Sequence, residues 1–530
     1  MILLSGVFGP FGVDDDFGRK ENIMELFHNQ ITKVQGIASL RFHHRSFGLY
    51  FLAENVNAGV TVLDFPSRRR FIRELRKGYD IVGISFIAPN FSKAREMARL
   101  VREHSKKSVI LLGGHGAAIE NIEDLIPCDH VVRGEGIGWL RSYLGEDPEA
   151  PIRHPNMPSN DYHRVYGIPM PGITAGLLVP GVGCDNGCRF CSTTHFFGKA
   201  YKPFVSSGKD LFDIACRMAD SDGYDTFFVL DENFLRHREN ASGLLAEMER
   251  SGRWFKFHVF ASADSVSEFG VENLARLGVH MLWIGIESKT GPIFPKNEGI
   301  DHAALIADLR RHGISVLASC ILCMEHHNPE NMREDINHMI ALKADMFQFM
   351  LLTSLPVTGV YQDHKDQKRL KTELPFEEWH GQKCLNYTHP AFPGDTPEQW
   401  LNLAFREEHE RNSSSIFRMI ETALLGYRTL SAKAEHDPVF KVRTSQMLER
   451  VQEYRQLLPT IRQHPVNTLE RERAKALDHE IEALIGPTTL KQRVYSRIAQ
   501  LFALWWAIRV KLSSDTVQPK NRVTHYRTNQ

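Results

Sequence analysis

The first 150 residues alternate short apolar runs with segments whose apolar residues recur every three or four positions. The apolar runs span residues 2–4, 60–63, 81–85, 109–113 and 131–132. Segment 91–104 gathers its apolar residues on one helical face, namely Ala94, Met97, Ala98 and Val101. Continuous apolar runs are typical of buried parallel strands, and their alternation with helices predicts a doubly wound α/β sheet over residues 1–150.

Small and polar residues follow three of these predicted strands. They are Ser85, Gly113, Gly114, His115, Gly134 and Glu135. In a doubly wound sheet the ligand lies at the carboxyl ends of the strands, and glycine there lets a ligand approach the backbone. We therefore expect these six residues to line a ligand site.

A proline-containing linker is predicted over residues 151–172, and the pattern changes after it. Strand-like runs recur at 176–182, 226–231, 255–262, 280–287, 315–322 and 346–352, with helical segments between them. Six strand–helix units in series predict a partial parallel (β/α)6 barrel over residues 173–390. Its chemistry should lie at the carboxyl ends of the strands.

Residues 391–512 read as helices, and the polar residues 513–530 are predicted to be a disordered tail. One helical stretch, 497–511, carries Trp505 and Trp506 between basic residues. It is too short to span a bilayer. Two interpretations stay open: a terminal helix packed on the protein, or a helix that contacts a membrane surface.

Composition narrows the class of protein. The 530 residues include 64 Lys and Arg against 64 Asp and Glu, so no basic surplus indicates a nucleic-acid partner. Eight cysteines in a chain of this length are not a disulfide framework, which favours a reducing compartment. We see no secretory signal and no membrane-spanning stretch, so we expect a cytoplasmic protein with an option of membrane association.

Three cysteines within eight residues carry the strongest chemical signal. Cys184, Cys188 and Cys191 follow the first strand of the predicted barrel with the spacing C-x3-C-x2-C. Such a loop can hold a [4Fe-4S] cluster by three thiolates and leave one iron open to a substrate. The alternative is structural zinc, which needs four ligands. Cys320 and Cys323 would supply a poor second half, because they lie three apart in a strand.

At this cysteine motif the sequence resembles the radical S-adenosylmethionine enzymes. Segments 80–85, 112–115 and 132–136 further resemble the Rossmann-like cobalamin (B12)-binding domain that many of these enzymes carry. The resemblance implies three cofactors: a [4Fe-4S] cluster, S-adenosylmethionine and cobalamin. The D-x-H-x-x-G motif is absent, so the lower axial ligand is undetermined; His115 is either a ligand or a loop residue. Some relatives keep the sheet without the corrinoid.

The resemblance also assigns residues of the barrel to S-adenosylmethionine. Glu232 and Glu287 match acidic positions of the family at the second and fourth strand ends, followed by Ser288, and Ile321 matches the fifth-strand position beside adenine. A helix cap is the alternative role for Glu232, and a salt bridge for Glu287. Cys323 stands where relatives have glycine, and we expect it to be a buried small side chain rather than a reactive thiol.

The implied activity is formation of a 5′-deoxyadenosyl radical and methylation of an unactivated carbon in a lipid-like or natural-product substrate. An external one-electron reductant of flavodoxin or ferredoxin type would be required. Two alternatives remain: a non-methylating radical cyclase or oxidoreductase, and a non-catalytic cobalamin or iron–sulfur protein used for sensing or electron transfer. No residue of this sequence identifies itself as a catalytic acid, base or nucleophile.

Overall fold

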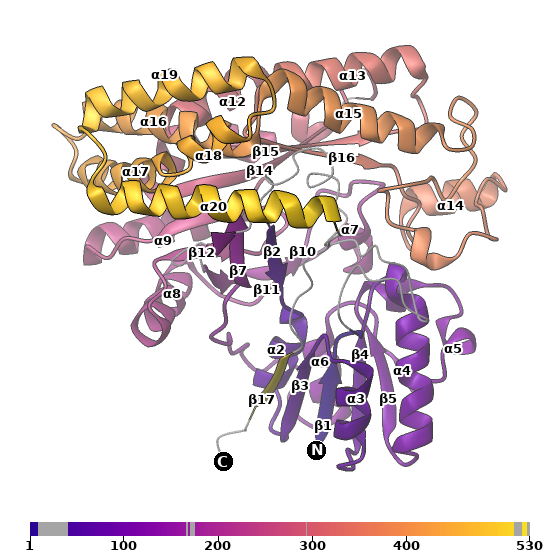
Figure 1. Cartoon of the computed structure of the whole chain (residues 1–530). Helices are drawn as coiled ribbons and strands as arrows, with labels where there is room; N and C mark the ends of the chain where they lie inside the picture. The colour runs from indigo at the N-terminus through magenta and orange to yellow at the C-terminus, as the bar shows by residue number, and fades with distance from the viewer. Residues whose placement is uncertain (9–40, 166–167, 170–174, 293, 513–521, 527–530) are drawn as a thin grey trace.

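Two six-stranded sheets, one above the other, organise the molecule (Figure 1). The computed structural model describes residues 1–8, 41–165, 168–169, 175–292, 294–512 and 522–526. The N-terminal sheet occupies the lower part of Figure 1, the second sheet lies above it, and C-terminal helices cover the top. The predicted combination of a doubly wound domain, a partial barrel and a helical C-terminal region is confirmed.

The N-terminal sheet has five parallel strands in the order β3-β1-β4-β5-β6. They are β1 (Ile2–Ser5), β3 (Val60–Asp64), β4 (Ile81–Ser85), β5 (Val109–Gly113) and β6 (His130–Val131). One face packs against α2 (Phe47–Glu54) and α6 (Gly136–Tyr143), and the other against α3 (Arg68–Leu75), α4 (Phe91–His104) and α5 (Ile122–Leu125). Burial of both faces explains why these strands are apolar runs rather than alternating patterns.

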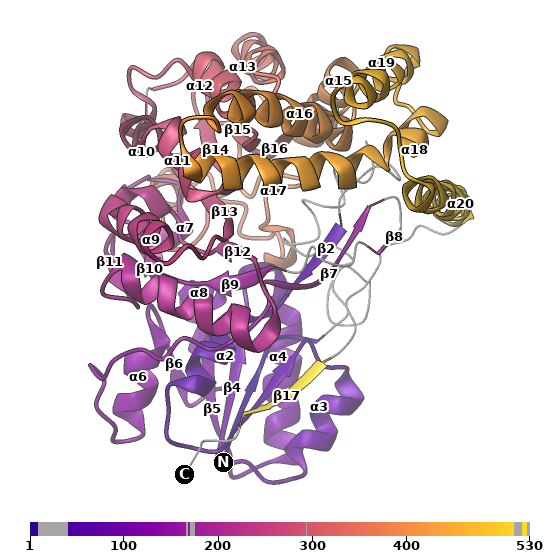
Figure 2. The ribbon, with the colours of Figure 1, turned by 90° about the vertical axis from the view of Figure 1, so that its left-hand side faces the viewer.

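The sixth strand of this sheet comes from the far end of the chain. Arg522–Tyr526 forms β17, which pairs antiparallel with β3 at the sheet edge (Figure 2). The prediction of a disordered tail over 513–530 therefore does not hold for this segment, while 513–521 and 527–530 lie outside the described residues. This short, largely polar segment forms a strand because the open edge of β3 supplies hydrogen-bond partners.

The second sheet is the expected partial barrel. Its six strands are parallel and follow one another in chain order, and each is paired with the next. They are β9 (Gly176–Leu178), β12 (Thr226–Val229), β13 (Lys256–Phe260), β14 (Val279–Glu287), β15 (Ser315–Leu322) and β16 (Met346–Leu351). The helices between them are α8 (Gly208–Asp222), α9 (Arg238–Ser251), α10 (Ala263–Phe269), α11 (Val271–Leu277), α12 (His302–Arg311) and α13 (Pro329–Ala341).

Part of the predicted linker is folded. β7 (Asn160–Val165) pairs antiparallel with β2 (Arg41–His44) and with β8 (Ile168–Pro169). The rest of the linker that is described, 151–159, leads from the first domain into this small sheet, and 166–167 and 170–172 lie outside the described residues. The linker thus contributes strands as well as a connection.

The C-terminal helices pack over the barrel. They are α14 (Gly359–Asp366), α15 (Thr396–Asn412), α16 (Ser415–Lys433), α17 (Pro438–Arg455), α18 (Leu458–Gln463), α19 (Thr468–Ile485) and α20 (Leu490–Leu512). In α17, Arg443 donates to the carbonyls of Phe255 and Leu277, and Arg450 donates to that of Gly313. These carbonyls lie just before β13, β14 and β15, so α17 closes the amino-terminal end of the barrel. The carboxyl ends of the strands remain available for chemistry.

Candidate functional site

One cavity lies where the carboxyl ends of the N-terminal strands face the start of the barrel. Its volume is about 550 Å³. From the first domain it is lined by all six residues that the sequence predicted: Ser85, Gly113, Gly114, His115, Gly134 and Glu135. From the barrel it is lined by residues around the cysteine loop and the end of β12, including Gly183, Thr193, Phe196 and Glu232. A ligand held here would touch both domains.

Glycines of the β5 loop make room for this cavity in two ways. Gly114 has a φ of +79°, and a Cβ there would lie 2.6 Å from the Phe86 carbonyl oxygen. Gly116 packs against the Phe86 ring, which a Cβ would approach to 2.4 Å. Gly113 differs, since a Cβ there would meet no atom within 4 Å and has open space before it. Two glycines therefore shape the loop, and the third leaves the space.

His115 and Glu135 line the cavity and differ in how their polar atoms are engaged. The His115 ring stacks on Phe196 with centroids 4.6 Å apart, and its Nε2 is buried without a hydrogen-bond partner among the described residues. Burial lowers the pKa of His115 to about 4, so the ring is neutral. Glu135 caps α6, where its carboxylate accepts hydrogen bonds from the N–H groups of Ile137 and Gly138. Glu135 is therefore engaged in capping, whereas His115 keeps an unpaired ring nitrogen.

The three cysteines lie in one loop between β10 (Gly181–Gly183) and α7 (Ser192–Phe196). All three are free thiols; Cys184 is buried, and Cys188 and Cys191 are half-buried. A single tetrahedral zinc would hold sulfur ligands about 3.8 Å apart. A structural zinc site also needs a fourth ligand, which this loop does not supply. Three thiolates suit a cluster in which each sulfur binds its own iron.

The surroundings of the thiols also suit a metal cluster. Burial raises the pKa of Cys184 to about 11 and also raises that of Cys188, where the Lys296 ammonium acts in the opposite direction. Without a metal, the thiols of Cys184 and Cys188 thus keep their protons, and a bound metal would displace those protons. The donor set therefore fits a [4Fe-4S] cluster held by Cys184, Cys188 and Cys191.

Glu232 and its neighbour Asp231 have separate environments at the end of β12. The Asp231 carboxylate accepts hydrogen bonds from the Asn233 N–H and, at 2.8 Å, from the Tyr201 hydroxyl. Glu232 is exposed to the cavity yet enclosed by protein, and burial, followed by the charge of Asp231, raises its pKa to about 7. Asp231 is therefore structurally occupied, and Glu232 is the carboxyl group that a cavity ligand would meet.

Glu287, at the end of β14, forms an ion pair whose partner the sequence did not reveal. Lys296 Nζ lies 2.5 Å from Glu287 Oε1, and both side chains are largely buried. A Cβ on Gly285 would lie 2.3 Å from the same Glu287 oxygen. Glu287 has a φ of +68°, a left-handed conformation that costs a residue with a side chain about 1 kcal/mol. The salt bridge given above as the alternative role of Glu287 is present, and the strained backbone is typical of a functional position.

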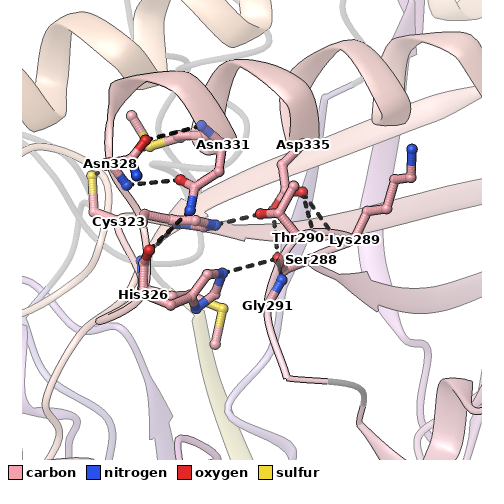
Figure 3. A network of polar contacts seen from close by, with 12 residues as sticks. Ser288, Lys289, Thr290, Gly291, Cys323, His326, Asn328, Asn331 and Asp335 are labelled. Atoms are coloured by element: carbon pink, nitrogen blue, oxygen red, sulfur yellow. Dashed lines mark hydrogen bonds and ion pairs between the residues drawn. The ribbon is translucent and has the colours of Figure 1, made fainter.

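A polar network behind Glu287 fixes Ser288 (Figure 3). Asp335 of α13 accepts hydrogen bonds from the Ser288 hydroxyl, from the N–H groups of Lys289 and Thr290, and from His327 Nε2 at 3.0 Å. These bonds keep the pKa of Asp335 low although burial alone would raise it. The network ties the loop after β14 to α13.

The same network contains a group with metal-ligand chemistry, His326, His327 and Asp335. His327 Nδ1 accepts the Met324 N–H at 2.9 Å, so Nε2 carries the proton that it donates to Asp335. His326 Nε2 contacts the Ser288 hydroxyl at 3.3 Å. Because the ligand atoms are engaged with one another, we assign this group a structural role.

Ile321 and Cys323 end β15 beside this network. Ile321 is half-buried near the strand end, where the resemblance places adenine. Cys323 is fully buried; its sulfur contacts Met332, and its carbonyl accepts the Tyr387 hydroxyl. Burial raises the pKa of the Cys323 thiol to about 12. The expectation of a buried small side chain is confirmed.

Three residues of this region escaped the sequence analysis: Lys296, Tyr201 and Asp335. Tyr201 lies on the short strand β11 (Tyr201–Pro203), Lys296 in a short 3-10 helix (Pro295–Asn297) and Asp335 on α13. None of them belongs to a motif with a fixed spacing from the cysteines. Their roles emerge only from contacts between segments that are distant in sequence.

Comparison with known proteins agrees with this geometry. Residues 36–142 match the B12 binding domain family. An uncharacterized methyltransferase of Pyrococcus horikoshii is 22% identical over 320 residues, which cover 53% of this chain and 69% of that protein. The bacteriochlorophyllide d C-12(1)-methyltransferase of Chlorobaculum tepidum is 22% identical over 312 residues, 55% of this chain and 67% of that protein.

A solved structure matches most of the chain. It is the radical S-adenosylmethionine methyltransferase TsrM from Kitasatospora setae with cobalamin and a [4Fe-4S] cluster bound; the TM-score is 0.52 and the identity 16%, over 85% of this chain and 99% of that one. Residues 36–142 of the present chain therefore match the B12 binding domain family, and the chain as a whole shares the fold of this solved structure.

Proposed function

We propose that this protein is a cobalamin-dependent radical S-adenosylmethionine methyltransferase. One observation carries the proposal: a single cavity is lined by the glycine-rich strand ends of the B12 binding domain and by residues around the cysteine loop. The sequence relatives are named methyltransferases, and the matching structure holds both cofactors. When bound, the cluster would supply an electron to cleave S-adenosylmethionine, and cobalamin would supply a transferable methyl group.

The residues of this chain would then bind and orient. Cys184, Cys188 and Cys191 would hold the cluster, and Gly113 would leave room for the corrin at the mouth of the first domain. Glu287 would accept hydrogen bonds from the ribose or amino group of S-adenosylmethionine, with Lys296 as its counter-ion. Because α17 closes the amino-terminal end of the barrel, substrate and cofactors would enter from the carboxyl end of the strands.

For the substrate we propose a lipid-like or other largely apolar natural product. Phe228, Phe260 and Trp283 are half-buried on adjacent barrel strands, with successive ring centroids 5.5 and 5.0 Å apart. They alternate with residues packed against the outer helices, so their rings face the barrel interior. An aromatic interior favours an apolar substrate. Another matching structure shows TsrM with its substrate tryptophan and an analogue of S-adenosylmethionine bound. Tryptophan is the substrate of TsrM and is not assigned to the present chain.

The proposal is tested with anaerobically purified protein, reconstituted with cluster and cobalamin. It receives S-adenosylmethionine with a deuterated methyl group, flavodoxin or ferredoxin as one-electron donor, and lipid or small-molecule extract from cells that lack the gene. We expect S-adenosylhomocysteine, 5′-deoxyadenosine and one product with the intact labelled methyl.

5′-Deoxyadenosine without methylated product would favour a radical cyclase or oxidoreductase. Failure to cleave S-adenosylmethionine at all would favour a sensor or electron carrier. Fractionation of cells would test the proposed cytoplasmic location.

A further inference from the structure

The last long helix, α20, packs on the protein by its small residues and leaves its large apolar residues exposed. Ala499, Ala503 and Trp506 are at most 1% exposed and face α18. Hydrogen bonds from Ser496 to the Gln456 carbonyl and from Gln500 to the Pro459 carbonyl hold the helix in place. The two adjacent tryptophans thus have different roles, since Trp505 is 50% exposed.

The exposed residues form one stripe along α20, the apolar stripe. Its members are Leu490, Val494, Ile498, Leu501, Trp505, Ile508 and Leu512. They recur at intervals of three and four residues, so they fall within about 80° of the helix circumference. Phe502 and Leu504 widen the stripe on its two sides. A continuous apolar surface of this kind normally marks an interaction site.

The charged residues beside the apolar stripe indicate what kind of partner binds it. α20 contains five basic and no acidic residues. By helical periodicity Lys491 lies along one edge of the stripe, and Arg493 and Arg497 along the other. All three are exposed, and none has a carboxylate partner within the described part of the chain. Basic residues on both flanks of an apolar face suit a surface that is apolar in its interior and anionic at its border.

A second copy of the chain would fit this surface less well. The intervals of three and four residues resemble a coiled-coil seam, but such seams are flanked by residues of opposite charge. A symmetric partner would bring the same basic residues to both edges, where like charges repel. Within the described residues no helix has the length and hydropathy required to cross a bilayer. A contact between α20 and a membrane would therefore lie along the bilayer surface and would not span the bilayer.

We propose that α20 is a membrane-docking helix, whose apolar stripe enters the interface of an anionic lipid bilayer while Lys491, Arg493 and Arg497 contact lipid phosphates. Its geometry matches that of interfacial helices, which bury one apolar face among headgroups and gain affinity from anionic lipid. Figure 1 shows α20 lying across one side of the molecule, and the chain later re-enters the N-terminal sheet as β17. The buried face of α20 holds the helix on the protein, so the apolar stripe faces outward.

The test measures co-sedimentation of the full chain with vesicles of phosphatidylcholine, with or without phosphatidylglycerol. Leu501→Ser/Trp505→Ser should weaken partitioning at least about ten-fold. Arg493→Gln/Arg497→Gln should weaken it about thirty-fold on anionic vesicles and little on neutral ones. The matched control is Leu469→Ser/Leu484→Ser, which removes two exposed leucines from the neighbouring α19 and should leave partitioning unchanged.

Two further readouts keep the outcome decisive. Brominated lipid should quench part of the wild-type tryptophan fluorescence, and Trp505→Phe should remove that part while binding persists. Light scattering reports the oligomeric state without lipid. A dimer that Leu501→Ser/Trp505→Ser converts to monomer would overturn the proposal in favour of self-association. Absence of vesicle binding, or equal binding to neutral and anionic vesicles, would also overturn it. None of these readouts depends on methyl transfer.

Discussion

The two parallel sheets present their carboxyl ends to a shared region, but with different kinds of residue. The N-terminal strands end in Gly113, Gly114 and Gly134. The barrel strands end in charged side chains, above all Glu232 and Glu287. The first set offers space and backbone, whereas the second offers carboxylates. This contrast matches a large, mostly apolar corrin on one side and a small charged cofactor on the other.

Backbone conformation repeats the contrast in part. In the loops after β5 and β6, positive φ values occur at glycines, +79° at Gly114 and +81° at Gly134, where they carry no steric penalty. At the barrel, Glu287 and Cys323 adopt φ of +68° and +56° with their side chains present. The first domain has one comparable residue at a strand end, Phe65 after β3, with a φ of +50°. Each sheet edge can be disabled separately, which makes the comparison testable.

The largest effect is expected at the cysteine loop. Cys188→Ala leaves two thiolates for the cluster, so iron and sulfide content and reductive cleavage of S-adenosylmethionine should fall to background. Cobalamin binding should persist, because Cys188 does not line the cavity. Cys216→Ala on α8 is the matched control and should change neither. If Cys188→Ala also abolished cobalamin binding, the two sheet edges would not be separate sites.

The converse variant is Gly113→Val. A Cβ at Gly113 would meet no protein atom within 4 Å, and Gly113 lines the cavity, so we expect the valine side chain to enter the cavity. Cobalamin binding should then be lost while the cluster and the melting temperature are retained. Absorption spectra of the reconstituted protein report both cofactors. Gly59→Ala, at a glycine with equally free surroundings outside the cavity, is the control. Undiminished cobalamin binding by Gly113→Val would contradict the assignment of this cavity.

A smaller effect, on the free energy of unfolding, is expected at Asp335, whose hydrogen bonds hold the loop after β14. Asp335→Ala removes the acceptor of four hydrogen bonds and leaves buried N–H groups without a partner, which should lower the free energy of unfolding by about 3 kcal/mol. Urea denaturation measures it. Asp308→Ala, which removes an exposed ion pair with Arg311 on α12, should cost less than about 0.5 kcal/mol. Equal losses for both variants would argue against a positioning role for Asp335.

Much of this contrast could be predicted from local sequence. Apolar runs predict the strands, and the last residue of a run falls at the end of the strand, as Gly113 and Glu287 do. An ion pair of Glu287 could be predicted from its position, but its partner Lys296 could not, because Lys296 lies in a separate 3-10 helix, Pro295–Asn297, that no motif marks. β17 could not be predicted, because its strand character depends on the open edge of β3.

The face of α20 that packs on the protein shows another limit. Sequence periodicity finds an apolar stripe but normally assigns it to the core. Here the contact surface is built from alanine and one tryptophan, and the larger residues point outward. Only the position of α18 decides which face is buried. The sequence pattern therefore predicts the helix, whereas tertiary packing determines which of its faces is buried.

The smallest effect tests whether Glu232 belongs to the charged barrel edge or to the apolar cavity. Its pKa is raised from 4.5 to about 7, so the folded protein holds this proton more tightly than the unfolded chain does. The contribution of Glu232 to stability should therefore be largest below pH 4.5 and decline as the pH rises toward 7, by about 1 kcal/mol once solvent in the cavity is allowed for. Glu232→Gln removes this dependence, so its gain in melting temperature over wild type should be larger at pH 8 than at pH 5. Bound cobalamin would exclude solvent and enlarge the difference, whereas a gain independent of pH would place Glu232 in bulk solvent and outside the cavity.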